Sequence, residues 1–297
     1  MENVYKKMPP EDLRQLQLIQ LEMLLEVDRI CKKNNIRYCI IAGTLLGAVR
    51  HKGYIPWDDD ADVAMLRPEY ERFCKACEKD LDRTRFYLQT HSNTPGYRWG
   101  YGKIRRVGTE FVRKGQEHMP YPTGIFIDIF PLDNVPDNLL ARRVHNITCT
   151  VIRKMLWSAV GAKSDSNPIM RGVYGCLSLL PRDFIFSMYD WLMRTSNKKQ
   201  TKMLRILTFP TPNNGYYGYY RKWYVELADI EFEGYYFPGA KDYDEYLTFK
   251  FGNYKEFPPI EQRQGHASTR YRLLPLDQRL LKLEEKNQFD DTKMGAQ

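Results

Sequence analysis

Residues 51 to 66, "HKGYIPWDDDADVAML", place four carboxylates within five positions and then continue into apolar residues. The acids are Asp58, Asp59, Asp60 and Asp62. Carboxylates this close raise one another's pKa, and burial beside an apolar run adds to the cost. A bound cation is the simplest way to offset this repulsion, so the stretch is the first candidate for a functional site.

The alternation of acids and apolar residues in this stretch predicts a β-strand. If residues 58 to 65 are extended, Asp58, Asp60 and Asp62 point to one face and the apolar residues between them point to the core. Asp59 then points to the opposite face. A helix here would leave only a thin apolar stripe, so the strand is favoured.

Magnesium, or manganese in its place, is the cation that suits this pattern best. An EF-hand calcium loop is excluded because its sixth position needs a glycine, and here that position is Val63, with Pro68 also inside the loop. Mg²⁺ held by carboxylates together with phosphate oxygens is typical of phosphoryl-transfer sites. We therefore predict Asp58, Asp60 and Asp62 as metal ligands.

A phosphate-binding turn is predicted immediately before the acids. In "AGTLLGAVR", Gly43 and Thr44 stand where a short buried strand turns into a helix, and free N–H groups at such a point attract phosphate. Arg50 and Lys52 are further candidate phosphate ligands, although they equally suit a basic helix terminus.

A further carboxylate is predicted from the apolar strand "GIFIDIF". Its single acid, Asp128, is costly to bury without a partner, which favours a metal-binding or catalytic role over the alternative of structural hydrogen bonding. The signatures of acyl transfer, G-x-S-x-G, and of Walker-type phosphate loops, GxxxxGK[ST], are absent from the sequence.

The order of the predicted elements indicates a mixed α/β (α+β) core with flanking helices and a helical insertion. An amphipathic helix is expected over 10–34, and residues 144–209 are apolar and helical in pattern. We divide the chain into a catalytic core at 1–136, a basic helical insertion at 137–210, and an aromatic-rich C-terminal part with a charged tail at 211–297.

The charge of this 297-residue chain is concentrated in the insertion. Residues 137 to 207 hold 12 Lys/Arg and 4 Asp/Glu, so this segment has a net charge of +8. The whole chain has the same net charge of +8. A polyanionic partner is one interpretation, whether nucleic acid, an anionic membrane face or a phosphorylated substrate, and a solvated basic surface is the other. No secretory signal or membrane-spanning run is recognisable, so we expect a cytoplasmic protein, with association at the inner membrane face as an option. Six cysteines argue against a disulfide scaffold.

Three stretches resemble the LicD family of phosphocholine transferases, in the nucleotidyltransferase-fold superfamily and related to fukutin-type phosphotransferases. The stretches are "GTLLGAVRHKGYIPWDDDADVAM", "GIFIDIFPLDNVP" and "FEGYYFPGAKDYDEYLTFKFGNYKEFPP". The superfamily pattern, in which h is a hydrophobic residue, is a hydrophobic-Gly-Gly/Ser turn followed by Asp-h-Asp-h and then by h-Asp-h. In this chain the turn is matched by Gly43-Thr44, the second part by Asp60 to Val63, and the acid of the third part by Asp128. Thr44 departs from the usual Gly or Ser but keeps the hydroxyl.

The resemblance implies metal-dependent transfer of phosphocholine, or a similar phospho-alcohol, from CDP-choline or another CDP-alcohol. The implied acceptor is a hydroxyl of a cell-surface polysaccharide, teichoic acid or lipopolysaccharide precursor, free or lipid-linked. Asp60, Asp62 and Asp128 would be catalytic, with Asp128 orienting or deprotonating the acceptor.

The sequence is also compatible with two alternative functions, and it does not decide which residues contact choline or sugar. A nucleotidyltransferase that uses an NTP on RNA or protein would keep the same fold, whereas a non-catalytic nucleic-acid-binding protein would leave the acids unexplained. Nucleic acid is therefore not the expected partner. The aromatic run "YYGYYRKWY" offers Tyr219, Tyr220 and Trp223 as candidate contacts for choline or sugar, but such residues equally suit a packed core.

Overall fold

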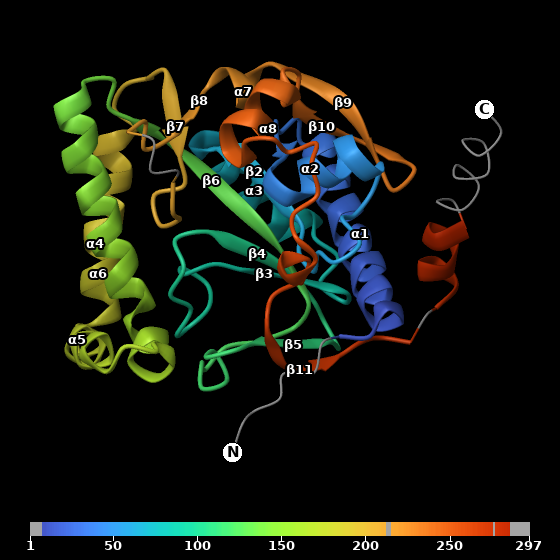
Figure 1. The fold of residues 1–297 in the computed structure, drawn as a ribbon, viewed down its shortest axis with the longest axis horizontal. Helices are drawn as coiled ribbons and strands as arrows, with labels where there is room; N and C mark the ends of the chain where they lie inside the picture. The colour runs from blue at the N-terminus through green and yellow to red at the C-terminus, as the bar shows by residue number, and fades with distance from the viewer. Residues whose placement is uncertain (1–7, 212–214, 276, 286–297) are drawn as a thin grey trace.

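The central element is a mixed β-sheet with helices packed around it (Figure 1). The computed structural model describes residues 8–211, 215–275 and 277–285. Within them, the main sheet has seven strands in the order β1-β2-β6-β4-β3, and β7 and β8 extend it beyond one end of β6. The strands are β1 (Cys39–Ile40), β2 (Asp62–Leu66), β3 (Phe86–Gln89), β4 (Gly102–Arg106), β5 (Glu110–Arg113), β6 (Phe126–Val135), β7 (Met203–Arg205), β8 (Tyr219–Tyr220), β9 (Leu227–Phe232), β10 (Tyr235–Ala240) and β11 (Ser268–Arg272).

Only one pair among the described strands of the main sheet is parallel, and it is the pair that matters for the site. β2 and β6 run parallel with Asp62 opposite Asp128, while the other pairings are antiparallel. β5 and β11 form a separate two-stranded sheet, as do β9 and β10. The helices are α1 (Pro10–Lys33), α2 (Ala42–His51), α3 (Arg67–Asp80), α4 (Leu139–Ser164), α5 (Pro168–Ser178), α6 (Arg182–Ser196), α7 (Lys222–Val225), α8 (Tyr243–Phe251) and the short 3-10 helix η1 (Ile260–Gln262).

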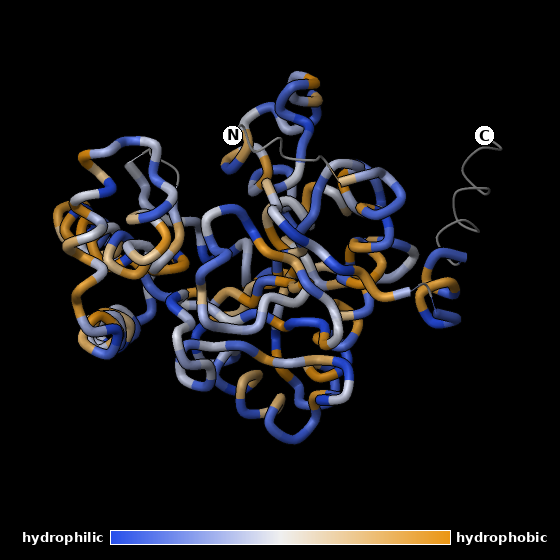
Figure 2. Tube along the Cα trace, turned by 90° about the horizontal axis from the view of Figure 1, so that it is seen from below, coloured by the Kyte–Doolittle hydropathy of each residue, from blue (hydrophilic) through white to orange (hydrophobic). Residues whose placement is uncertain are grey.

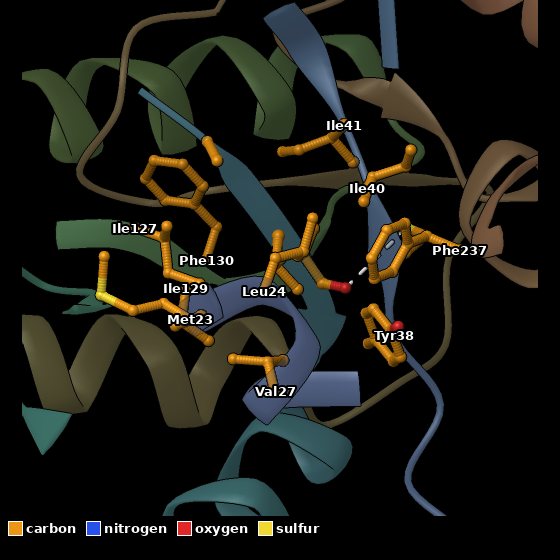
Figure 3. Close-up of a cluster of buried hydrophobic side chains, with 14 of the residues drawn as sticks. Met23, Leu24, Val27, Tyr38, Ile40, Ile41, Ile127, Ile129, Phe130 and Phe237 are labelled. Carbon is orange, nitrogen blue, oxygen red and sulfur yellow. Dashed lines mark hydrogen bonds between the residues drawn. The ribbon is translucent and has the colours of Figure 1, made fainter. Parts of the chain in front are cut away.

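Helix α1 packs against the sheet and is buried over most of its length. Its apolar residues, including Met23, Leu24 and Val27, contact the same core as Ile127 and Ile129 of β6 (Figure 3). The amphipathic helix predicted over 10–34 is confirmed by α1. Several of its polar residues are buried as well, and two of them, Gln17 and Gln20, donate hydrogen bonds to the backbone of the acidic stretch.

Helices α4, α5 and α6 form a separate lobe at one side of the sheet, which we call the helical module (Figure 1). The module has a small apolar core of its own, to which Ile152, Leu156 and Tyr189 belong. It is tied to the sheet by a hydrogen bond between Tyr189 of α6 and a buried ion pair that joins α3 to β6. Arg67 donates to both carboxylate oxygens of Asp133, at 2.7 and 2.6 Å, and its guanidinium also lies 3.0 Å from the Tyr189 hydroxyl of α6.

The mixed α/β fold with flanking helices predicted from the sequence is confirmed, but two strand boundaries are wrong. The strand expected to begin at residue 58 begins at Asp62, because the carbonyls of Asp58 and Asp59 accept hydrogen bonds from α1 rather than from a neighbouring strand. The short buried strand expected to lead into Gly43 is limited to Cys39–Ile40, because α2 already begins at Ala42. No helix among the described residues is both long and apolar enough to cross a bilayer. The part of the predicted charged tail that follows residue 285 lies outside the described residues.

We expect Asp133→Ala to destabilise the protein strongly. The substitution leaves the Arg67 guanidinium buried without its partner, so the free energy of unfolding should fall by about 3–5 kcal/mol. The matched control is Asp183→Ala, whose side chain is 94% exposed and whose loss should leave the free energy of unfolding nearly unchanged. Urea denaturation of both variants tests this, and equal effects would contradict it.

Acid should weaken the packing of α4 against α6 within the helical module. His145 of α4 lies 2.9 Å from the Ser196 hydroxyl, and burial lowers its pKa to about 4 from 6.5. Because the unfolded chain binds this proton first, the stability that His145 contributes is complete above pH 6.5 and declines as the pH falls toward 4. We expect His145→Asn to flatten the pH dependence of unfolding in this window. An unchanged slope in chemical denaturation between pH 4 and 6.5 would contradict this account.

Candidate active site

Two strands bring Asp62 and Asp128 together at the start of β2. The two residues are register partners on neighbouring parallel strands, so their side chains share one face of the sheet. The Asp128 N–H donates to the Ala61 carbonyl at 2.9 Å, which fixes the strand pairing up to this point. Asp128 is buried and Asp62 is partly exposed, so the pair is reachable from one side.

Asp58 and Asp60 complete a four-carboxylate group with this pair, which we call the acidic cluster. The pKa of Asp58 is raised well above its ordinary value by burial and then by the charges of Asp60 and Asp59. Burial also raises the pKa of Asp62, followed by the charges of Asp60 and Asp128. The four predicted acids therefore lie close enough to repel one another, although Asp58 and Asp60 precede the strand.

Two cations from the next strands face this cluster. Lys103 of β4 is buried and pairs with Asp128, and the partly buried Arg113 of β5 donates to Asp60 at 3.1 Å. Burial lowers the pKa of Lys103 to about 7, against the opposing effect of Asp128. The Lys103 ammonium also lies 3.4 Å from the centre of the Phe126 ring, which holds the side chain over the sheet. Neither cation is singled out by sequence motifs.

His266 reaches the site from the far end of the chain. Its backbone N–H donates to Asp59 at 2.8 Å, and its Nδ1 lies 2.7 Å from Asp59 and 3.5 Å from Asp60. The pairing of β11 with β5 brings this segment over the acids, and a side chain at Gly265 would collide with Asp59. Asp59 thus points toward His266. No sequence motif marks His266, because its approach depends on a pairing between two strands that are far apart in the chain.

The backbone of the acidic stretch is held by polar side chains of α1 and α2. Gln17 donates to the Asp58 carbonyl at 2.9 Å and Gln20 to the Asp59 carbonyl at 2.8 Å. The Asp62 N–H donates to the Thr44 hydroxyl at 2.8 Å. These hydrogen bonds replace the strand pairing that residues 58 to 60 lack, so the carboxylates stay in place.

The predicted phosphate-binding residues lie at the two ends of α2. Gly43 stands at its beginning, where an added Cβ would lie only 2.8 Å from the Asp58 carboxylate. Thr44 is buried and engaged with Asp62. Arg50 and Lys52 stand at the opposite end of the helix. Arg50 donates to the carbonyl of Tyr254 at 2.9 Å, so the structure does not group it with Gly43.

The predicted aromatic contacts lie in a cluster around α7 and α8. Trp223 is 2% exposed and Tyr219 is 8% exposed, both packed against Tyr246, while Tyr220 is half-buried. Lys250 donates to the Tyr219 hydroxyl at 3.1 Å and also lowers the pKa of Asp62 through its charge, against the larger effect of burial. Of the three, Tyr219 is therefore linked to the acidic cluster, through Lys250. The role of the three aromatic residues in binding choline or sugar stays a prediction.

A cavity of about 610 Å³ adjoins the acidic cluster and is lined by aromatic and cationic side chains. Lys103, Arg113 and His266, which contact the acids, form part of its wall. Its described lining residues include six Lys/Arg side chains and no carboxylate, and we call it the aromatic-basic pocket. Its wall also contains Arg105, Lys114, Arg153, Lys154, Tyr101, Phe126, Trp157 and Tyr174. A larger cavity of about 810 Å³ beside β3 contains none of the predicted site residues among its described lining.

The residues of the site fit a divalent cation. Carboxylate oxygens are the ligands that Mg²⁺ and Mn²⁺ prefer, and a cation would offset the repulsion within the acidic cluster. Ligand atoms of Asp59, Asp60 and His266 also lie within 4.8 Å of one another. The candidate ligands thus form two groups that share Asp60, one of which includes His266, a residue that the sequence did not indicate.

Comparison with known proteins agrees with the class of protein that the sequence suggests. Residues 35–143, which run from β1 through β6 to the beginning of α4, match the family model described as LicD/FKTN/FKRP, nucleotidyltransferase domain. The resemblance to the LicD family predicted from the sequence is thereby confirmed.

This chain is similar to one relative over nearly all of that relative's length. The chain is 29% identical over 268 residues to the lipopolysaccharide cholinephosphotransferase LicD of Haemophilus influenzae, with 86% of this chain and 95% of the relative covered. Two uncharacterized proteins share short segments. The protein of Rickettsia typhi is 44% identical over 52 residues, which cover 18% of this chain and 17% of that protein. The protein of Rickettsia prowazekii is 46% identical over 48 residues, which cover 16% of this chain and 18% of that protein.

We expect Gly43→Ala to weaken metal binding without unfolding the protein. The new methyl group would lie 2.8 Å from the Asp58 carboxylate and displace it, so affinity for Mn²⁺ should fall by about tenfold or more. Alanine favours the helix by up to about 1 kcal/mol, which preserves stability. The matched control is Gly172→Ala in α5, where the added methyl meets open space. Equal Mn²⁺ affinity of both variants in calorimetry would contradict the assignment.

Proposed function

We propose that the protein is a metal-dependent transferase that moves phosphocholine, or a similar phospho-alcohol, from a CDP-activated donor to a hydroxyl of a cell-surface glycan. Candidate acceptors are lipopolysaccharide, teichoic acid or another polysaccharide precursor. The observation that carries the proposal is the position of the acidic cluster beside the aromatic-basic pocket. The similarity to a lipopolysaccharide cholinephosphotransferase supports the choice of phosphocholine.

The pocket suits the nucleotide diphosphate part of such a donor. Its six Lys/Arg side chains favour the diphosphate, and its aromatic faces can stack on the base. The same charges disfavour the choline cation, so we expect the nucleotide in the pocket and the transferred group toward the acids. A donor placed this way has its diphosphate near Lys103 and Arg113, which line the pocket and also contact the acidic cluster.

In the proposed reaction the acceptor hydroxyl attacks the phosphorus that carries choline, and the bond from that phosphorus to CMP breaks. Asp128 would orient the hydroxyl and take its proton, and Lys103 holds the Asp128 carboxylate in place. Asp58, Asp60 and Asp62 would hold Mg²⁺ or Mn²⁺, which supplies positive charge to the phosphate oxygens when bound. Arg113 would stabilise the departing phosphate of CMP from the pocket side.

The donor class is tested by calorimetry with CDP-choline, CDP-ribitol, CTP and ATP, each with and without Mg²⁺. We expect one CDP-alcohol to bind in a metal-dependent manner, and Asp60→Asn to abolish that dependence because Asp60 belongs to both candidate ligand groups. Binding of NTPs alone would favour the nucleotidyl-transfer alternative instead. No binding of any nucleotide would contradict the proposal.

The catalytic assignment is tested separately by turnover. With labelled donor and glycan acceptor, Asp128→Asn should lower transfer by at least about a hundredfold, the usual effect of losing a general base. Donor binding should remain, because Asp128 faces the acceptor in this scheme. The matched control is Asp244→Asn, an exposed acid of α8. Retained turnover in Asp128→Asn would remove that residue from the mechanism.

A further inference from the structure

The helical module carries a row of apolar side chains on the side that faces away from its own core. On α4, Leu140, Val144, Ile147 and Val151 follow one another at spacings of four, three and four residues, so they share one face of the helix. Their exposed fractions range from 42% to 71%. The buried residues of α4, such as Cys149, belong to the module's core instead.

Helix α6 continues this apolar surface across a shallow groove. Phe184 is 51% exposed and Trp191 is 62% exposed, seven residues apart and therefore on one face. Trp191 and Met188 form one wall of a groove of about 290 Å³, whose other wall is Thr148 and Ile152 of α4. The groove joins the two rows, and we call the joint surface the outer face. Figure 2 shows the module as a lobe along which hydrophobic and hydrophilic residues alternate.

The charge around the outer face is strongly positive. Within the module and the three residues that follow it, the cations that are exposed are Arg143, Lys154, Lys163, Arg171, Arg194, Lys198 and Lys199. The acids in the same range are Asp165, Asp183 and Asp190, and only Asp183 is exposed. Arg143 and Lys154 flank the apolar row of α4, at one or three positions from its members.

We propose that the outer face docks the protein onto an anionic lipid surface. Exposed apolar side chains flanked by Lys and Arg are the combination by which amphipathic helices lie in a membrane interface. Nucleic acid would satisfy the cations but not the apolar rows. A second copy of this chain would cover the apolar rows but would bring two strongly positive modules together, and like charges across an interface oppose association.

Docking through the outer face also positions the aromatic-basic pocket relative to the lipid surface. Trp157 of α4 and Tyr174 of α5 line the aromatic-basic pocket, so the module that would touch lipid also forms a wall of that pocket. A docked protein therefore holds the pocket close to the lipid surface. This inference goes beyond the proposed reaction, since binding to lipid needs neither donor nor metal.

The test is flotation of the full-length protein with vesicles of phosphatidylcholine alone or mixed with phosphatidylglycerol. We expect binding to the anionic vesicles only, weakened by salt. Ile147→Ser and Trp191→Ser should each lower the partition coefficient about tenfold, because each removes a large apolar side chain that would enter the lipid interface. The control is Ile260→Ser on η1, a residue 76% exposed outside the module, which should bind as the wild type does.

A second pair of variants tests the electrostatic part. Arg143→Gln and Arg194→Gln should each lower binding about fivefold at low salt, as expected for a cation near an anionic membrane. The exposed cations Lys75 and Lys79 of α3 serve as controls, and their change to Gln should have no effect. All variants should keep donor binding in calorimetry, so a failure here is separate from a failure of the proposed function.

Three results would overturn the proposal. The first is absence of wild-type binding to anionic vesicles. The second is equal binding by Ile147→Ser and Trp191→Ser and by the wild type, which would place the contact elsewhere. The third is a concentration-dependent dimer in sedimentation that Ile147→Ser dissolves, which would assign the outer face to a second copy of the chain.

Discussion

The repulsion among the carboxylates at the start of β2 is the constraint on which the rest of this site depends. Burial and the neighbouring carboxylates raise the pKa values of Asp58 and Asp62, and two cations, Lys103 and Arg113, offset only part of the negative charge. A folded chain tolerates such a cost where a ligand offsets it, and a divalent cation with phosphate is the ligand that this donor set suits. The adjoining cationic pocket supplies the complementary environment for a diphosphate.

Much of the fold serves to hold this repelling group in place. Because residues 58 to 60 lack strand partners, Gln17 and Gln20 bind their backbone, and Thr44 binds that of Asp62. Buried polar groups of this kind are costly unless paired, and here the amide N–H groups of Gln17 and Gln20 and the Thr44 hydroxyl each form a hydrogen bond with the acidic stretch. The burial of α1 against the sheet is therefore part of the site as well as of the core (Figure 3).

The sequence predicts the local features well and the long-range ones poorly. The opening helix, the change from strand to helix at Gly43 and the presence of a partner for the buried Asp128 follow from periodicity and from the rule that a buried acid needs a partner. His266 could not be found this way, since its place depends on the pairing of β11 with β5. The apolar rows of the helical module were expected to be helical, but which faces stay exposed is decided by how α4 and α6 pack.

The most direct test of the central claim is thermal unfolding at increasing Mg²⁺ or Mn²⁺, comparing the wild type with Asp62→Asn. Without metal, the variant should unfold at a higher temperature, because it removes one of the repelling charges. With metal, the wild type should gain about 2.7 kcal/mol at a concentration one hundred times its dissociation constant, and the variant much less. A wild type that responds to neither ion at millimolar concentration, or a variant that responds equally, would contradict the account.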